Sequence, residues 1–451
     1  MNNGKASLRD ALQRSLSGSV QFDAEANRQI GASLWNADVA PDVLALVECR
    51  SAADVQQAVR VASDYGALIS TLGGGHDWAG RAAGRGSITV DLRQLKAVEL
   101  NRDRSAVTIG GGTLIDHVLA GIPDDLAIVT GTISTVGVTG LTLGGGYGKL
   151  NSRFGLALDT MTRAEVVLAD GSTVVASEQD DAELFWALRG GGGNFGVVTS
   201  ITLAAHQLRH VLTGTIFVPL SSAKASLVGL QAILDDSGDE LSVFSALMTV
   251  PSGDRGLILA PMWAGGERAG ERALQTLSGL QGAQTLAQGW STYRATYNKK
   301  FEETWPKGRG YRMDAHNIQR LDDTTAEALV ECAKAFRSNA DCVMLHDFHG
   351  ACARVAPEAT AFPVRSEHFN VQVVTQWSMD RPRDGEAALQ SIEAVKEKLG
   401  PLAMRGGYTN ILGPNESSRV RAFYGTAAQR LADVKRRYDP SDRFRFNTGR
   451  L

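Results

Sequence analysis

Two glycine-rich runs and one histidine are the residues of this chain whose types and spacing point most directly to chemistry. The first run is Thr71–Gly80, with Gly73-Gly74-Gly75-His76 at its centre, and the second extends from Gly131 to Gly148. Glycine has no Cβ and adopts positive φ readily, so a glycine-rich loop brings backbone N–H groups close to a bound anion. Two such runs, one of them with a lone histidine, predict several loops that wrap a large phosphate-containing cofactor.

Neither run fits the common nucleotide-binding motifs. The P-loop pattern fails because Gly148-Lys149 is followed by Leu150, and the first glycine of the motif falls on Leu143. A dinucleotide-type trace at Gly191–Gly196 follows a helical pattern and precedes a strand-like one, whereas the dinucleotide fold has the strand first and the helix second. We therefore expect neither a P-loop nor a Rossmann site.

Taken together, the motifs resemble those of the flavoproteins typified by vanillyl-alcohol oxidase and p-cresol methylhydroxylase, and within them the berberine-bridge-enzyme-like branch. The segments that carry the resemblance, in the family's order, are Gly73–His76, Thr135–Gly148, Gly155–Asp159, Leu168–Gly171, Phe185–Gly190, Phe195–Thr199, Thr360–Phe362 and Arg437–Asn447. They span nearly the whole chain, which makes the resemblance more specific than any single motif. It implies an α+β fold, with a PCMH-type FAD-binding domain and a substrate domain whose antiparallel sheet is covered by helices.

The resemblance also implies FAD as the cofactor. The residues expected to hold it are Leu72, Gly73, Gly74, Gly75, His76, Asp77, Thr135, Val136, Gly137, Gly140, Gly144, Gly145, Gly146, Gly148, Val198 and Asn447. An imidazole nitrogen of His76 would bond to the 8α-methyl group of the flavin, which requires a neutral ring; a hydrogen-bonded loop histidine is the alternative.

The other cofactor contacts follow from the same resemblance. We expect the amides of Gly73–Gly75 and Gly144–Gly146 to bind the pyrophosphate. Val198 would present backbone groups to the adenine, and Asn447 would lie close to the flavin ring.

Two positions of the second run bear on how the flavin is attached and reoxidised. Many members of the family add a link from a cysteine to C6 of the flavin, but the matching residue here is Ile133, and none of the four cysteines lies in this loop. The flavin is therefore expected to be attached once. Val136 matches the family's oxygen gatekeeper position, where a small side chain is associated with O2 access, so it favours an oxidase; plain core packing is the alternative.

Substrate oxidation needs a group that takes a proton while hydride passes to flavin N5. Tyr408-Thr409-Asn410 resembles the family's Tyr-x-Asn signature, so Tyr408 is the candidate general base and Asn410 an orienting or flavin-contacting group. Tyr147 is the alternative phenol. Because an ordinary tyrosine has a pKa of ~10, either phenol needs a neighbouring cation or coupling to the reduced flavin. Core packing with a satisfied hydroxyl is the alternative for both.

The segment Cys342–Cys352 also contains His346 and His349, which are residue types that bind zinc. It lacks both Cys-x-x-Cys and His-Glu-x-x-His spacing, and we expect no metal. By resemblance the segment is a substrate-domain strand, with His349 as a residue that faces the pocket. An aromatic-rich stretch could also line the pocket or simply pack between helices: Trp290, Tyr293, Tyr297, Trp305 and Tyr311.

The elements that must position these residues alternate between short strands and amphipathic helices. In the first half we expect a helix over 53–65, strands over 67–71, 87–92 and 106–109, and a hairpin over 166–175 with Asp-Gly at its turn. After about residue 210 the strands 213–218 and 257–260 alternate with longer helices over 223–234 and 325–336. The predicted organisation is an FAD-binding domain (1–210), a substrate domain (211–404) and a C-terminal return to the FAD-binding domain (405–451).

Bulk properties narrow the class further. The 451 residues are too many for one ordinary core, and 43% hydrophobic with 21% charged residues describe a soluble globular protein. A net charge of −3 gives no reason to expect nucleic acid as a partner. No stretch approaches the ~20 apolar residues of a membrane span, and no secretion signal or disulfide framework is evident. The expected location is cytoplasmic, and the sequence does not predict an oligomeric state.

These observations predict an oxidase with covalent FAD that takes hydride from an alcohol or amine carbon of a small organic substrate and reduces O2 to H2O2. A dehydrogenase of the same fold that uses another acceptor is the first alternative. A flavin-binding protein without turnover is the second, and a metal-dependent enzyme built on the His346 region is the third.

Overall fold

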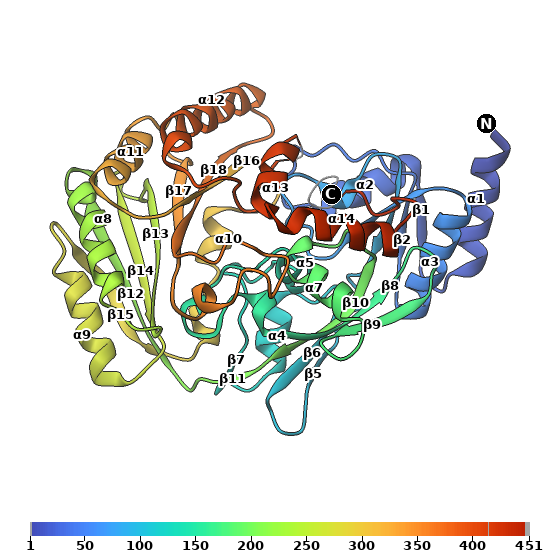
Figure 1. The fold of residues 1–451 in the computed structure, drawn as a ribbon. Helices are drawn as coiled ribbons and strands as arrows, with labels where there is room; N and C mark the ends of the chain where they lie inside the picture. The colour runs from blue at the N-terminus through green and yellow to red at the C-terminus, as the bar shows by residue number, and fades with distance from the viewer. Residues whose placement is uncertain (1, 414, 447–451) are drawn as a thin grey trace.

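The computed structural model describes residues 2–413 and 415–446 (Figure 1). Over these residues the chain builds two mixed parts that lie side by side. One part combines a four-stranded and a five-stranded sheet, and the other is built on a seven-stranded sheet. The predicted α+β class is confirmed.

The four-stranded sheet carries the first glycine run at the end of one of its strands. Its strands, in spatial order, are β1 (Val20–Phe22), β2 (Ala45–Glu48), β4 (Ser87–Asp91) and β3 (Leu68–Leu72). β2 and β3 are parallel to β4, and β1 is antiparallel to β2. Every residue of β4 is buried, as is typical of a central parallel strand. β3 is the predicted strand that leads into the histidine loop.

Helices pack around this sheet. They are α1 (Asn2–Ser15), α2 (Asp23–Ser33) and α3 (Ala52–Asp64). α3 begins with a capping box, in which the Ser51 hydroxyl accepts from the Asp54 N–H and the Asp54 carboxylate accepts from the Ser51 N–H. This local signal explains why the helix begins where the sequence predicts it.

The five-stranded sheet is antiparallel throughout and joins the second glycine run to the core. Its strands, in spatial order, are β5 (Val98–Leu100), β6 (Ala106–Gly110), β10 (Val197–Ala204), β8 (Met161–Val167) and β9 (Thr173–Ser177). β8 and β9 form the predicted hairpin. α7 (Ala182–Gly191) precedes β10, so the helix-then-strand order that argued against a Rossmann site is confirmed. β7 (Leu126–Ala127) and β11 (His206–Gln207) form a separate two-stranded pair.

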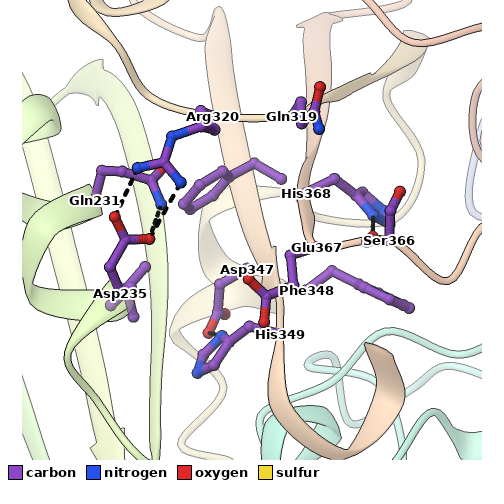
Figure 2. A pocket seen from close by; sticks show the side chains of 12 residues that line it. Gln231, Asp235, Gln319, Arg320, Asp347, Phe348, His349, Ser366, Glu367 and His368 are labelled. Carbon is purple, nitrogen blue, oxygen red and sulfur yellow. Dashed lines mark hydrogen bonds and ion pairs between the residues drawn. The ribbon is translucent and has the colours of Figure 1, made fainter. Parts of the chain in front are cut away.

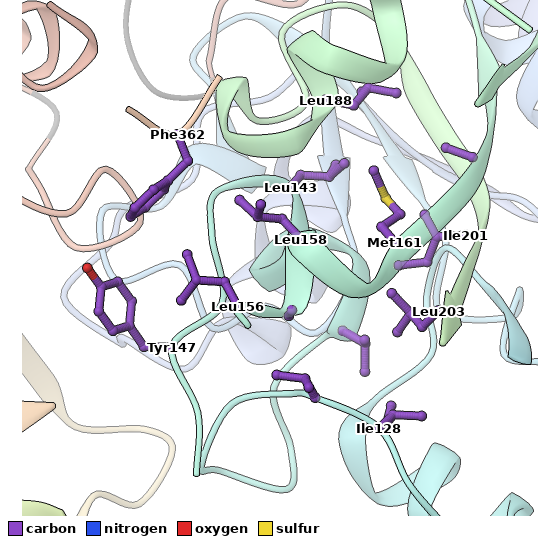
Figure 3. Packing of buried hydrophobic residues seen from close by; sticks show 14 of the residues in the cluster. Ile128, Leu143, Tyr147, Leu156, Leu158, Met161, Leu188, Ile201, Leu203 and Phe362 are labelled. Carbon is purple, nitrogen blue, oxygen red and sulfur yellow. The ribbon is translucent and has the colours of Figure 1, made fainter. Parts of the chain in front are cut away.

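Short helices fill the space around the second glycine run. They are α4 (Ile115–Gly121), α5 (Val138–Leu143), α6 (Asn151–Phe154) and a 3-10 turn at Ala157–Thr160, with further 3-10 turns at Arg81–Ala83, Arg294–Thr296, Gly350–Arg354 and Gly400–Leu402. Leu143, Leu156 and Leu158 pack into the apolar core between α7 and β10 (Figure 3). Tyr147 and Phe362 lie at the edge of this core, with the Tyr147 hydroxyl directed away from Leu156. Burying a leucine contributes about 1.5–3 kcal/mol, so the core holds this loop firmly.

The seven-stranded sheet is antiparallel and is covered by helices on its outer face, as predicted (Figure 1). Its strands, in spatial order, are β15 (Gln284–Ser291), β12 (Val211–Pro219), β14 (Arg255–Trp263), β13 (Leu241–Thr249), β17 (Cys342–Phe348), β18 (His368–Trp377) and β16 (Gly310–Ile318). The covering helices are α8 (Leu220–Asp235), α9 (Glu267–Ser278), α11 (Asp323–Lys334) and α12 (Pro382–Leu399). The short helix α10 (Lys300–Thr304) lies on the other side of the sheet.

The register of β17 against β18 determines which side chains point away from the covering helices. Met344 pairs with Gln372, His346 with Asn370, and Phe348 with His368. Successive side chains of a strand point to opposite faces, so these six share one face. Their neighbours Val343, Leu345, Val371 and Val373 pack with the helices. The six therefore face the part that carries the glycine runs.

The C-terminal segment returns to the first part of the chain. Its helices are α13 (Ser417–Tyr424) and α14 (Ala427–Tyr438). The Arg430 guanidinium forms an ion pair with Glu183 of α7 and lies over the Trp186 ring, and the Ile69 N–H donates to the Arg443 carbonyl. Among the residues described, no helix is long and apolar enough to cross a membrane.

Candidate active site

A cavity of about 340 Å³ lies between the glycine runs and the inner face of the seven-stranded sheet. Its glycine-loop side includes Gly73, Gly74, Gly75, His76, Asp77, Ile133, Val136, Gly137, Gly140 and Val198. Its other side includes Phe301, Trp305, Met313, Met344, His346, Gln372 and Val374. Tyr147, Tyr408 and Asn410 also line it. The fold thus brings residues of both glycine runs to one cavity with all three candidate catalytic side chains.

Some of the expected cofactor residues lie behind this wall. They are Leu72, Thr135, Gly144, Gly145, Gly146 and Gly148. Leu72 is fully buried at the end of β3, and the hydroxyl of Thr135 lies 2.8 Å from His76, which does line the cavity. Asn447 lies outside the described residues.

The first glycine run offers free hydrogen-bond donors. Within the described part of the chain, the N–H groups of Gly73, Gly74, Gly75 and His76 donate to no other residue. A Cβ at Gly74 would collide with the backbone nitrogen of Gly137, so glycine is what lets the two runs approach each other here. Unpaired N–H groups on a cavity wall suit the phosphate oxygens of a dinucleotide.

His76 is held with one ring nitrogen engaged. Its Nε2 lies 2.8 Å from the Thr135 hydroxyl, and the Trp35 ring stacks on it with centroids 5.8 Å apart. Burial lowers the pKa of His76 to about 4, against the opposing attraction of Glu302. The ring is therefore neutral at physiological pH, and its Nδ1 is not taken by the Thr135 contact.

The expectation that Gly144–Gly146 bind the pyrophosphate is wrong, because their N–H groups are occupied. Those of Gly144 and Gly145 donate to the Thr142 carbonyl at the end of α5, and that of Gly146 donates to the Tyr408 hydroxyl at 3.0 Å. Two of the three N–H groups therefore close the end of α5, and the third positions a tyrosine. A glycine run in the sequence predicts available N–H groups but not which acceptor reaches them.

Tyr408 and Asn410 form one unit with the second glycine run. The Tyr408 hydroxyl oxygen accepts from Gly146 and from the Asn410 amide at 2.8 Å, and that amide also donates to the Leu141 carbonyl. Burial raises the pKa of Tyr408 to about 12, although the two donors oppose the shift. Both donors are N–H groups, so the phenol keeps its own proton for another acceptor.

Tyr147 is bound in the opposite sense. Its hydroxyl lies 2.8 Å from Nε2 of His368, and its ring meets that of Tyr408 edge-on at 4.8 Å. Burial, reinforced by Tyr408, raises the pKa of Tyr147 well above its ordinary value of 10. Within the described residues neither phenol hydroxyl forms a hydrogen bond with a cation, although the charge of Arg365 opposes the rise of the Tyr147 pKa. Tyr147 has a neutral imidazole instead.

The wall formed by the seven-stranded sheet was not predicted residue by residue. Gln372 is oriented by a chain of amides: its Nε2 donates to Asn370 Oδ1, and Asn370 Nδ2 donates to Asn317 Oδ1, both at 2.8 Å. This leaves the Gln372 carbonyl oxygen as an acceptor toward the cavity. Only the alternation of the strand could have signalled Gln372, and that pattern does not identify its face.

Two sequence expectations about this wall are corrected. His346 lines the cavity and His349 does not, because His346 shares the inner face with Met344 while His349 follows the end of β17 and pairs with Asp347 at 3.2 Å. Of the aromatic stretch, only Trp305 lines the cavity. Tyr293 and Tyr297 bond to each other at 2.7 Å, and Tyr311 stacks on Trp35. Core packing accounts for them.

The described cysteines and acidic side chains form no alternative centre. Cys49, Cys332, Cys342 and Cys352 are buried and free, and burial raises the pKa of each thiol. Within the described residues no group of three or more His, Cys, Asp or Glu side chains is arranged to hold a metal ion.

Comparison with known proteins agrees with this site. Residues 43–177 match the family described as FAD binding domain, and residues 407–449 match Berberine and berberine like. The chain is 28% identical to (R)-6-hydroxynicotine oxidase of Paenarthrobacter nicotinovorans over 97% of each protein.

Solved structures share the fold. The crystal structure of 6-hydroxy-D-nicotine oxidase from Arthrobacter nicotinovorans superposes with a TM-score of 0.85 at 28% identity, covering 96% of this chain and 98% of that one. Glucooligosaccharide oxidase from Acremonium strictum, whose structure is described as holding a 6-S-cysteinyl, 8α-N1-histidyl FAD, has a TM-score of 0.87 at 22% identity over 97% of each chain. This chain is an FAD-linked oxidoreductase that is similar to the berberine-bridge-enzyme-like proteins.

Proposed function

We propose that the protein is an oxidase that holds FAD covalently through His76 alone and oxidises an alcohol or amine carbon of a small organic molecule, with O2 as the electron acceptor. The observation that carries this proposal is a neutral His76 on the wall of a cavity that also contains two buried phenols. Bound FAD would supply the hydride acceptor at N5 and pass the electrons on to O2.

A single attachment is supported by the residues around the loops. His76 engages Thr135 through Nε2, which leaves Nδ1 for a bond to carbon. Ile133 lines the cavity where a second link would need a thiol, and among the described residues no cysteine lines it. The glucooligosaccharide oxidase described with two links supports histidyl attachment as a capacity of this fold.

The oxidation itself is supported by the hydrogen bonds of the two tyrosines. Tyr408 presents a proton to the cavity because its oxygen already accepts twice, and Tyr147 has a base behind it. In this reaction a base removes the O–H or N–H proton of the substrate at the same time as hydride leaves the carbon. Such general base catalysis typically contributes 10²–10⁴-fold in rate. Val136 lines the cavity with a small side chain, which supports O2 as the acceptor.

The shape and polarity of the wall favour an uncharged, apolar substrate. Among the lining residues, charged side chains come only from Asp77 and Arg81, which pair with each other at 2.7 Å on the glycine-loop side. The sheet side offers aromatic and sulfur-containing surface with Gln372 and His346 as its polar groups. An aromatic ring that carries an oxidisable alcohol or amine suits this wall better than an acid.

We also propose that the chain is divided into an FAD-binding domain and a substrate domain. Residues 1–210 and 405–451 would form the FAD-binding domain, and residues 211–404 would form the substrate domain. The cavity's two sides come from these two groups of residues, which supports the division.

The first experiment asks where the flavin goes. The purified protein and its His76→Ala variant are precipitated with acid, with His210→Ala, an exposed histidine outside the cavity, as the matched control. Yellow pellets for the wild type and control, with a yellow supernatant for His76→Ala, support the histidyl link. A coloured His76→Ala pellet, or a colourless wild-type pellet, overturns it.

The second experiment tests the reaction. A panel of benzylic alcohols, aromatic amines and aldoses is added without air, and bleaching of the flavin absorbance is recorded. Bleaching followed by reoxidation in air with release of H2O2 supports the oxidase. Reoxidation only by an added quinone supports the dehydrogenase, and no bleaching by any compound contradicts the proposal.

A further inference from the structure

A second cavity, of about 260 Å³, opens between α8 and the adjoining ends of β17 and β18 (Figure 2). It is more polar than a core void. Asp347, His349, Ser366, Glu367 and His368 line it, and the Asp235–Arg320 ion pair closes one side. The activity proposed above assigns no role to this cavity.

His368 connects the two cavities. It lines the second cavity, yet its Nε2 reaches the hydroxyl of Tyr147, which lines the first. The ring is fixed by stacking on Phe348, with centroids 4.3 Å apart and planes 23° apart. Tyr147–His368 is therefore a direct hydrogen-bonded contact between the proposed substrate site and a separate polar space.

The direction of the hydrogen bond follows from the other ring nitrogen. His368 Nδ1 lies 2.7 Å from the Ser366 carbonyl oxygen, which can only accept. Nδ1 therefore carries the hydrogen, Nε2 carries a lone pair, and Tyr147 donates. Burial lowers the pKa of His368 to about 4, so Nε2 is unprotonated at neutral pH and its lone pair can accept the Tyr147 hydrogen.

The same reasoning separates the two phenols. The Tyr408 oxygen is occupied by two N–H donors, whereas the Tyr147 oxygen accepts no hydrogen bond from a described residue and donates its hydrogen to His368. A phenol that can lose its proton to a base behind it can accept another proton in front.

We propose that His368 is the positioning residue of a proton relay, in which Tyr147 takes the substrate's O–H or N–H proton while its own proton passes to His368 Nε2. This step rests on the proposed function. The substrate C–H bond breaks with its electron pair, which goes to the flavin; the C=O or C=N bond forms; and one proton ends on the imidazole. The flavin is the oxidant, and the substrate loses two electrons and two hydrogens.

The imidazolium formed in this step would be costly in a dry core. The second cavity, which the carboxylates of Asp347 and Glu367 also line, adjoins His368, so the surroundings of this residue are not uniformly apolar.

The test compares His368→Gln, His368→Ala and Tyr147→Phe with the exposed-site control His210→Gln. The probe is the panel compound that bleaches wild-type flavin fastest, and flavin reduction is followed by anaerobic stopped flow. We expect the limiting reduction rate of His368→Gln to fall about 10²-fold with an unchanged substrate Kd, because a glutamine carbonyl accepts the Tyr147 hydrogen bond but cannot take the proton.

Two further measurements distinguish a His368 that accepts the proton from a His368 that only holds Tyr147 in place. Imidazole added to His368→Ala should restore reduction, since the lost ring leaves a gap of its own shape beside the Tyr147 hydroxyl. Adding Tyr147→Phe to His368→Gln should cost little more than either change alone, because the two residues act in one step. A wild-type reduction rate in His368→Gln would overturn the relay and leave His368 as an anchor.

A measurement without substrate keeps the inference independent of the proposed function. In protein with ¹⁵N-labelled histidine, the signal lost in His368→Gln should report an Nε2 without hydrogen, and it should shift in Tyr147→Phe. A protonated Nε2 in the wild type would overturn the relay even if every panel compound is oxidised. Failure of all panel compounds to bleach would instead count against the proposed function.

Discussion

The lowered pKa of His76 predicts that flavin attachment continues in acid where an ordinary histidine would stop. Attachment requires the neutral ring, and burial lowers the pKa of His76 to about 4. At pH 5 roughly nine-tenths of such a ring is neutral, compared with about 3% for a histidine whose pKa is near 6.5. The two cases differ about 30-fold in the rate expected at pH 5.

The assay uses apoprotein mixed with FAD at pH 5, 6 and 7. Aliquots are denatured in acid, and the fraction of chains that gained the mass of FAD is measured against time. We expect the rate at pH 5 to lie within about twofold of that at pH 7. The Thr135→Val variant should attach FAD more slowly at every pH, because it lacks the hydroxyl that holds Nε2, and Thr135→Ser should restore the rate.

A fall of about 25-fold between pH 7 and pH 5, with a midpoint near 6.5, would refute the reasoning. It would mean that His76 is hydrated before FAD binds. Near-ultraviolet circular dichroism at each pH guards against acid unfolding as the cause.

Three other perturbations follow from the structure. Arg365→Met leaves the buried Asp159 carboxylate without the guanidinium that binds it through two hydrogen bonds of 2.8 and 2.9 Å. We expect the free energy of unfolding in urea to fall by about 3–5 kcal/mol, and a fall of less than about 1 kcal/mol would contradict a buried pair. Burial lowers the pKa of His346 and His368 to about 4, so the unfolded chain binds more protons below pH 6.5. Stability should therefore fall as pH drops from 6.5 toward 4, by about 4 kcal/mol at pH 5 for the two rings together, and equal urea midpoints at pH 7 and pH 5 would argue against this. Gln372→Leu removes the fixed acceptor, so the Kd of the best panel compound should rise about 2- to 10-fold; an unchanged Kd would show that Gln372 does not bind it.

Much of the local structure could be predicted because its causes are local. The Asp-Gly turn predicts the β8–β9 hairpin, and Ser51 with Asp54 accounts for the start of α3. A phosphate-containing cofactor could be predicted because glycine runs of this kind leave backbone donors accessible, as the free N–H groups of Gly73–Gly75 show, whereas FAD itself was implied by the family resemblance. The place of Ile133 in the second run predicts the missing thiol without any structure.

The hydrogen-bond partners of the catalytic side chains, and the residues that face the cavity, could not be predicted in this way. The N–H groups of Gly144 and Gly145 donate to Thr142 and that of Gly146 to Tyr408, and His346 instead of His349 lines the cavity. Each outcome depends on which acceptor or face a distant segment presents, and a shift of one residue in strand register reverses the face.

The sequence by itself therefore determined the kinds of groups available: a histidine among flexible glycines, one phenol inside the second run, another at Tyr408, and no cysteine in the loop of the second run. Only the tertiary structure decided how they are paired. Tyr147 and His368 are 221 positions apart, and their contact exists because β18 brings its inner face against the edge of the FAD-binding core. A hydrogen bond has strict distance and direction, so the direction in which a proton can move is set by packing between segments that composition and local pattern do not connect.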